Sequence, residues 1–306
     1  MTSSLKQNPF PLILNQGSPA SKLQVLKLID RVETSAGFKN LLRLVSLQNH
    51  DGGFPNNFEF SNPSSVKTTY RVARTLTYIG LDERSHTIMS AVDWLINQQE
   101  KDGGWHENPA IIIPEWVTWE STTKSVTWYT CQIAMLLKEL GMHETSAFRK
   151  AIAFFEKTEL SNGGWPPVIG MTELDADSSV GIGNFLAEIY GKNYRSFLRS
   201  KRIFEERMST LAEKASHEVI DDAYELTHLI FDKVSTYMYS IDDKRIRKVL
   251  EVLVQAQCED GGWKTFYSGG KSDVAMTVYA LQVLVSHGIV KKQTLQEMFD
   301  YAVKGC

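Results

Sequence analysis

The sequence predicts an all-α fold, a single α6/α6 barrel (toroid) of about twelve helices arranged in six hairpins. Three observations predict it: a short signature that recurs along the chain, helical apolar patterns before each copy, and small helix-capping residues after each copy. With 42% hydrophobic and 23% charged residues among 306, the chain can bury a large core.

The signature is a turn that begins with Gln or Glu and ends in Gly-Gly followed by an aromatic residue. Its four copies are residues 48–54, 99–105, 159–165 and 257–263. The aromatic residue recurs after 51, 60 and 98 residues, and the last gap fits two periods with one signature lost. We expect the glycines to supply the positive φ that ends one helix, and the aromatic side chain to pack back between neighbouring helix pairs.

The helices follow from the same pattern, taken in chain order. Inner helices are expected near 21–33, 64–79, 121–140, 176–190, 217–235 and 272–287, and outer helices near 37–48, 84–99, 145–158, 195–213, 243–257 and 291–303. Ser and Asp at the inner-helix starts are good N-caps. We expect residues 1–20 to form an N-terminal extension and 21–306 to form one domain, with no strand.

Composition excludes several classes of protein. The formal charge of −3 and the lack of a dense Lys/Arg block argue against a nucleic-acid partner. No apolar run reaches the roughly eighteen residues of a membrane span, and the N-terminus does not look like a secretory signal. Three cysteines without CxxC spacing predict neither disulfides nor a zinc site. We therefore expect a cytoplasmic protein.

Asp175 and Asp177 fall at the expected start of the fourth inner helix. Two close carboxylates can share a proton and separate their pKa values, which would suit an acid that protonates a carbon–carbon double bond. The alternative is that one of them is an N-cap and the other merely favourable to the helix dipole.

A second ionisable group lies on the expected fifth inner helix. On a continuous helix His217, Asp221, Tyr224 and His228 would fall within an arc of roughly 60°, with Glu225 near its edge. Such a stripe would have to be hydrogen-bonded, solvated or functional. It suits an acid/base relay or a metal site, and the alternative is a structural network of histidines satisfied by carboxylates.

The cofactor is left open, with a divalent Mg, Fe or Zn ion as the candidate. Its ligands would come from His217, Asp221, Glu225 and His228. Because His217 and His228 would be about 16 Å apart along a helix axis, both cannot hold one ion.

Aromatic residues gather after the second signature. Trp116 and Trp119 lie in a long loop, and Trp128 and Tyr129 follow on the third inner helix. Aromatic faces stabilise cations, so these four residues are candidates for substrate binding, as is Glu225. Plain packing is the alternative for each of them.

Four copies of the Gly-Gly-aromatic turn, each feeding a helix that begins with small residues, resemble the prenyltransferase and squalene-cyclase repeat. The resemblance covers residues from about 40 to 290. It implies the α/α barrel of triterpene cyclases, class II diterpene cyclases and protein prenyltransferase β subunits. In the cyclases an Asp-x-Asp-Asp motif supplies the acid. By resemblance Asp177 protonates the olefin or epoxide and Asp175 tunes it, while Ser178 replaces the last aspartate.

The resulting hypothesis is a cyclase or isomerase that acts on an isoprenoid or similar apolar substrate. Asp177 and Asp175 would initiate the reaction, and His217, Asp221, Tyr224 and His228 would reprotonate the acid or deprotonate the product. The alternatives are a metal-dependent enzyme on the same barrel and a non-catalytic barrel that binds a prenylated ligand or a protein. Full cyclases pair two barrels and protein prenyltransferases need a partner subunit, so a second subunit or a homodimer is also considered.

Overall fold

The computed structural model describes residues 5–59, 62–231 and 236–304. The chain divides into two compact units, one of residues 1–41 with 204–306 and the other of residues 42–203. Helices α3 (Ser35–Val45) and α9 (Arg195–His217) contain the boundaries between them. In the described residues there are thirteen α-helices, and none has both the length and the apolar character needed to cross a membrane.

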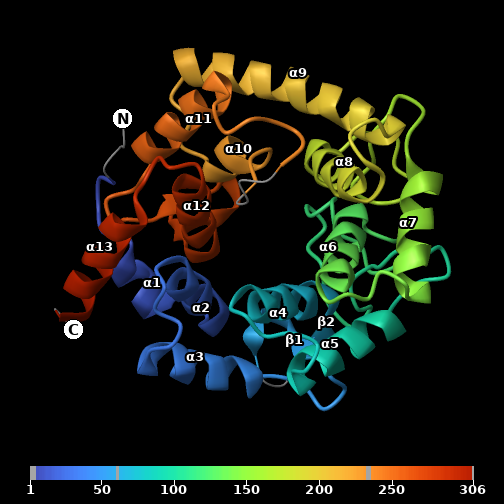
Figure 1. Ribbon diagram of the computed structural model, residues 1–306, viewed down its shortest axis with the longest axis horizontal. Coiled ribbons are helices and arrows are strands. Elements are labelled where there is room, and N and C mark those ends of the chain that lie inside the picture. The colour runs from blue at the N-terminus through green and yellow to red at the C-terminus, as the bar shows by residue number, and fades with distance from the viewer. Residues whose placement is uncertain (1–4, 60–61, 232–235, 305–306) are drawn as a thin grey trace. The chain divides into compact units, whose positions relative to one another are not determined.

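The unit of residues 42–203 contains three helices side by side, backed by others. Its elements are β1 (Phe54–Pro55), the 3-10 turn Asn56–Phe58, β2 (Ser64–Ser65), α4 (Val66–Tyr78), α5 (His86–Asn97), α6 (Thr127–Glu139), α7 (Ser146–Thr158) and α8 (Ala176–Tyr190). Helix α6 packs between α4 and α8, while α5 packs on α4 and α7 on α6 (Figure 1). Each pair therefore forms the expected helical hairpin.

The other unit is built around α12. Its elements are α1 (Phe10–Gln16), α2 (Pro19–Leu28), α10 (Ala223–Thr227), α11 (Lys244–Gln255), β3 (Trp263–Lys264), the 3-10 turn Phe266–Ser268, β4 (Ser272–Asp273), α12 (Val274–Ser286) and α13 (Lys292–Lys304). Helix α12 contacts both α2 and α10, and α11 packs on α10.

Most predicted helices are confirmed to within a few residues, with four corrections. The segment expected as an extension contains α1, which packs on α2 and α12. Two antiparallel strand pairs exist, β1 with β2 and β3 with β4. Each of these strands has two residues, which is too short to show the alternating pattern that predicts a strand. The third inner helix starts at Thr127 rather than 121. The helix expected over 217–235 is wrong: α10 has five residues, and 232–235 lie outside the described residues.

The recurrent signature is a hydrogen-bonded turn that joins an outer helix to an inner one. Its aspartate accepts hydrogen bonds from the backbone N–H of the second glycine and from the hydroxyl of the serine that precedes the inner helix. The three sets are Asp51 with Gly53 and Ser64, Asp102 with Gly104 and Ser125, and Asp260 with Gly262 and Ser272. The first glycine has positive φ, 96° at Gly103. Trp105 is fully buried and donates its indole N–H to Leu95 O at 2.6 Å. The predicted roles of the glycines and the aromatic residue are confirmed.

The third signature differs because its partner differs. Gln99 donates its side-chain N–H to Ala147 O at the start of the next outer helix. At the corresponding position Glu159 accepts from Ser196 Oγ at 2.7 Å and from Arg199 Nη1 at 3.0 Å. Glutamate replaces glutamine where the next outer helix, α9, offers donors instead of a carbonyl.

Cys131 lies in the middle of α6 and is fully buried. Burial raises the pKa of its thiol to about 12 from an ordinary 9.0. Because the thiolate is the reactive form, we expect iodoacetamide to leave Cys131 unmodified in the folded protein near pH 8 and to modify the partly exposed Cys258. Unfolding should expose both, as peptide mass spectrometry would show.

The raised pKa of Cys131 also makes the stability of the folded protein depend on pH. The folded state disfavours the thiolate, so Cys131 contributes stability below pH 9.0, and that contribution is lost as pH rises toward 12. Rapid modification of Cys131 without unfolding would contradict this account of the core.

Candidate active site

Asp175 is the N-cap of α8. Its carboxylate accepts from the backbone N–H of Ser178 at 2.8 Å, and its own N–H donates to Trp165 O at 2.9 Å. Asp175 therefore caps a helix, which is the structural alternative that the sequence offers for it. Asp177 lies in the first turn of α8 and is half-buried. Both residues therefore lie at the amino-terminal end of α8.

Asp177 occupies the same helix position as two residues on neighbouring helices. It lies two residues after the N-cap, as Lys67 does in α4 and Trp128 does in α6. Helices α4, α6 and α8 pack side by side, so these three residues occupy equivalent positions in successive helices. A lysine, a tryptophan and an aspartate are thus placed in succession.

The Trp128 ring reaches α8. A Cβ added to Gly181 would lie 2.8 Å from Trp128 Cζ3, so the glycine leaves room for the indole one turn beyond Asp177. The hydroxyl of Ser178, next to Asp177, is buried and makes no hydrogen bond among the described residues. The start of α8 therefore combines an acid, an aromatic face and a free buried hydroxyl.

A second polar group lies between α4 and α6. Lys67 pairs with Glu120, which belongs to the loop before α6. Tyr70 and Tyr129 are buried, with ring centroids 5.7 Å apart. Burial raises the pKa of Tyr129, and the nearby Tyr70 and the carboxylate of Glu120 raise it further. The Tyr129 phenol therefore stays protonated, so its O–H can donate a hydrogen bond and its oxygen can accept one.

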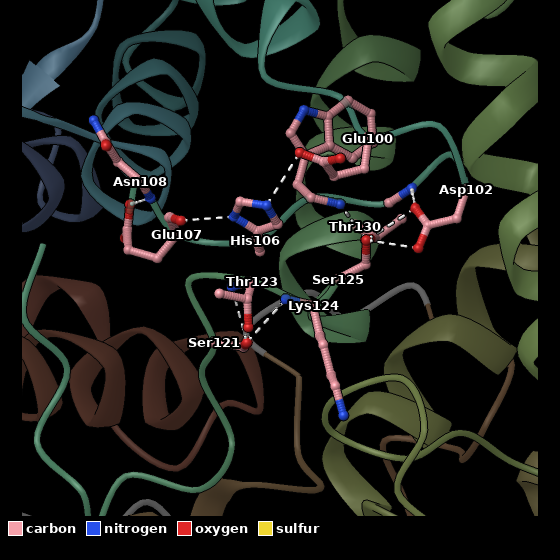
Figure 2. A network of polar contacts seen from close by, with 12 residues as sticks. Glu100, Asp102, His106, Glu107, Asn108, Ser121, Thr123, Lys124, Ser125 and Thr130 are labelled. Carbon is pink, nitrogen blue, oxygen red and sulfur yellow. Dashed lines mark hydrogen bonds and ion pairs between the residues drawn. The ribbon is translucent and has the colours of Figure 1, made fainter. Parts of the chain in front are cut away.

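Glu107 ties the loop that precedes α6 to the start of α4. This carboxylate is 2% exposed and accepts from Ser65 Oγ and from the backbone N–H groups of Val66, Lys67 and Asn108 at 2.7 to 3.2 Å. Figure 2 shows the same loop, with the His106 ring held between Glu100 and the Glu107 carbonyl. Glu107 thereby fixes the helix turn that carries Lys67.

The two predicted loop tryptophans pack on each other. The ring centroids of Trp116 and Trp119 are 5.9 Å apart, and Trp116 is 59% exposed. Both precede Glu120 in the loop, as the sequence predicted, but their role in substrate binding stays a prediction.

The predicted stripe on a fifth inner helix is wrong in its geometry. His217 ends α9, Asp221 lies in non-helical chain, and Tyr224 is the second residue of α10. The helix breaks because Asp222 turns its carboxylate back to cap α10, accepting from the N–H groups of Tyr224 and Glu225. His217, Asp221 and Tyr224 are exposed, so the argument from a buried polar stripe no longer applies.

Parts of that group have local partners. Asp221 forms an ion pair with Lys264 at 2.5 Å, and Glu225 forms one with Lys214 at 2.5 Å. The His228 ring packs near Tyr224, with centroids 5.8 Å apart. Within the described part of the chain, no three His, Cys, Asp or Glu side chains gather closely enough to hold a metal ion. The helical spacing on which the proposed metal ligands depended is therefore not present.

Sequence reasoning missed Lys67, Arg71, Glu107 and Glu120. The basic residues carried a signal, because positions 67, 71 and 74 share one face of a helix. Glu107 and Glu120 carried none, since each acts on a helix about 40 to 50 residues earlier in the chain.

These features belong to a known class of fold, the α/α toroid. Residues 44–169 match the family model of the squalene-hopene cyclase C-terminal domain, and residues 204–304 match that of the prenyltransferase alpha-alpha toroid domain. The predicted fold class and the resemblance to this repeat are confirmed. None of the curated proteins matches the sequence.

Solved structures agree on the fold. The type II terpene cyclase MstE from Scytonema is 12% identical, with a TM-score of 0.59 over 87% of each chain. A variant of it in complex with geranylgeranyl dihydroxybenzoate, its substrate, has a TM-score of 0.58 at 12% identity over 89% of this chain and 87% of that one. A protein from Actinoplanes is 15% identical, with a TM-score of 0.58 over 88% of this chain and 90% of that one. At these identities the likeness concerns the fold alone.

Proposed function

We propose that this protein is an acid-initiated isoprenoid cyclase or isomerase in which Asp177 is the proton donor. The observation that carries the proposal is the placement of Asp177 in the first turn of α8, half-buried and one turn before the Trp128 ring. The family motif places the acid at the same kind of helix start.

Proton transfer would begin the reaction. The Asp177 carboxyl adds its proton to one carbon of a double bond, and the adjacent carbon becomes a cation. The electrons of the next double bond then form the ring bond, and the final cation loses a proton, so that the product is an isomer of the substrate. Asp175 remains in its capping hydrogen bond, two residues before the proposed acid.

Aromatic side chains would stabilise the cation. An indole face attracts a positive charge more strongly than any other side-chain ring, and the Trp128 ring lies against Gly181 of α8. Tyr70 and Tyr129 offer two more rings on α4 and α6, and Trp116 and Trp119 are proposed to contact the substrate from the loop.

The experiment tests whether a proton from the solvent is added to a carbon of the substrate. The protein is incubated in D₂O with geranylgeranyl dihydroxybenzoate, the substrate of the structural neighbour, and with linear isoprenoids and their terminal epoxides. We expect an isomeric product that carries deuterium on carbon at the site of initiation. A product formed by loss of a leaving group, or cyclisation without deuterium at that carbon, would contradict acid initiation. Tight binding without turnover would favour the non-catalytic barrel.

A further inference from the structure

A glycine inside α8 lies directly against the Trp128 ring. A Cβ built at Gly181 would lie 2.8 Å from Cζ3 of the indole and 3.7 Å from Cε3 and from Cη2. Carbon atoms that are not bonded to each other are most stable about 3.5 to 4.0 Å apart, so any other side chain at position 181 would displace the ring. Glycine is one of the least favourable residues for a helix interior, yet Gly181 is the sixth of the fifteen residues of α8. The close approach of the indole gives that glycine a reason.

The backbone that carries Trp128 is tied to the chain segment that leads into α8. At the start of α6 the N–H of Thr127 donates to Pro167 O at 3.0 Å. In the same segment Trp165 O accepts from the N–H of Asp175, the N-cap of α8, at 2.9 Å. The starts of α6 and α8 are therefore held in one hydrogen-bonded frame. An indole that meets a new methyl group has to rotate, because its backbone has little freedom to retreat.

Gly181 also lies at an informative distance from Asp177. The two residues are one turn apart on α8, a rise of about 6 Å along the helix axis. That rise is comparable to the roughly 6 Å range over which the face of an aromatic ring attracts a cation. Trp128 is partly exposed, so part of its ring is accessible although one edge rests on α8. The frame and the glycine thus hold an accessible indole within reach of a charge formed beside Asp177.

We propose that Gly181 is a positioning residue, which lets the Trp128 indole lie against α8 and so presents the ring to a cation on an apolar chain. Trp128 contacts the cation, and Gly181 acts only through the position of that ring. The inference rests on the proposed function for the identity of the natural cation, which is the carbocation of the reaction. A stable ammonium ion on an apolar chain carries the same charge. It therefore tests the position of the ring without any turnover.

The experiment compares the binding of decyltrimethylammonium with that of decanol, which has the same chain and no charge. Both are titrated below the concentration at which the ammonium ion forms micelles, and binding is measured by titration calorimetry. The proteins are the wild type, Gly181→Ala, Trp128→Leu and the variant with both substitutions. The ratio of the two dissociation constants isolates the contribution of the charge, because a loss of apolar contacts weakens both probes alike.

We expect the wild type to prefer the ammonium ion by about three- to thirtyfold. Trp128→Leu should reduce that preference at least about threefold, and Gly181→Ala should reduce it to nearly the same value. In the Trp128→Leu background Gly181→Ala should have no further effect on the preference, because the ring through which it acts is gone. A glycine that only serves helix packing would leave the preference unchanged.

A smaller ring provides the control for folding. Gly181→Ala alone should lower the unfolding temperature by on the order of 3 to 10 °C, because it overpacks the contact with the indole. In a Trp128→Phe background the same substitution should keep or raise the unfolding temperature, since the shorter ring leaves room for the methyl group and alanine is the better helix former. If Gly181→Ala does not fold alone, this pair of variants still tests the contact and the preference for the ammonium ion.

Three results would overturn the proposal. They are equal affinity of the wild type for the two probes, a wild-type preference for the ammonium ion in Gly181→Ala, and an equal loss of preference from Gly181→Ala with and without Trp128. A protein that fails the D₂O experiment but shows the preference that depends on Gly181 keeps this cation site while the proposed reaction falls. The reverse result removes the role of Gly181 and leaves acid initiation standing.

Discussion

Asp177→Asn is expected to abolish formation of the deuterated isomer, with a loss of at least about a thousandfold in kcat. The amide keeps the size of the side chain but has no acidic proton to give, and the reaction has no other means of generating its first cation. Binding of the substrate should change little, because the tail contacts aromatic rings. The measurement is single-turnover product formation in D₂O, beside substrate binding and thermal unfolding of the same sample.

Two further variants separate acid catalysis from helix capping. Asp175→Asn keeps an equally good N-cap for α8 but removes the charge, so we expect a smaller loss of activity with unchanged stability. Asp273→Asn is the matched control, because Asp273 caps α12 in the same way through Met276 N at 2.8 Å. Asp177→Asn with wild-type turnover would contradict the assignment of the acid. Equal losses from Asp175→Asn and Asp273→Asn would reduce Asp175 to a cap.

The repeat made most of the fold predictable, because each of its residues has a local task. The aspartate, the two glycines and the serine close one turn among themselves, and the aromatic ring bonds to a carbonyl ten residues earlier, as Trp105 does to Leu95. Such contacts are encoded within a short stretch of chain. A reader of the sequence can therefore place the end of one helix and the start of the next.

The prediction failed where a signature is absent. Between residues 165 and 263 no Gly-Gly-aromatic turn marks the hairpin. The sequence pattern therefore predicts one continuous helix where the structure has a break. Val219 and Ile220 are β-branched, and Asp222 offers its own cap, so the chain leaves the helix after His217 and resumes it at Ala223. A periodicity argument treats all residues as helical and does not include these competing local bonds.

The position of the proposed acid at a helix start was predictable from the sequence, and the residues that hold the start of α4 were not. Asp177 follows from a motif at a helix start. Glu107 and Glu120 contact α4 from a loop whose path depends on long-range packing. The spacing of residues in the sequence does not predict that path.

Glu107→Ala is expected to lower the free energy of unfolding by on the order of 3 to 5 kcal/mol. The buried carboxylate serves four donors, and its removal leaves the first N–H groups of α4 without a partner in a place that water reaches poorly. Glu107→Gln should fall between alanine and wild type, because its carbonyl oxygen still accepts while its amide nitrogen meets other donors. Chemical denaturation followed by circular dichroism gives the three values.

A matched control lies in the same loop. Glu100 is about half exposed and pairs with His106 at 3.0 Å, so Glu100→Gln should cost less than about 1 kcal/mol. Hydrogen exchange distinguishes a local from a global loss of stability. In Glu107→Gln the amides of Val66 and Lys67 should exchange faster than those in the middle of α4. If Glu107→Ala costs no more than Glu100→Gln, this carboxylate does not hold the start of α4. The positions of Lys67 and Arg71 would then need another cause.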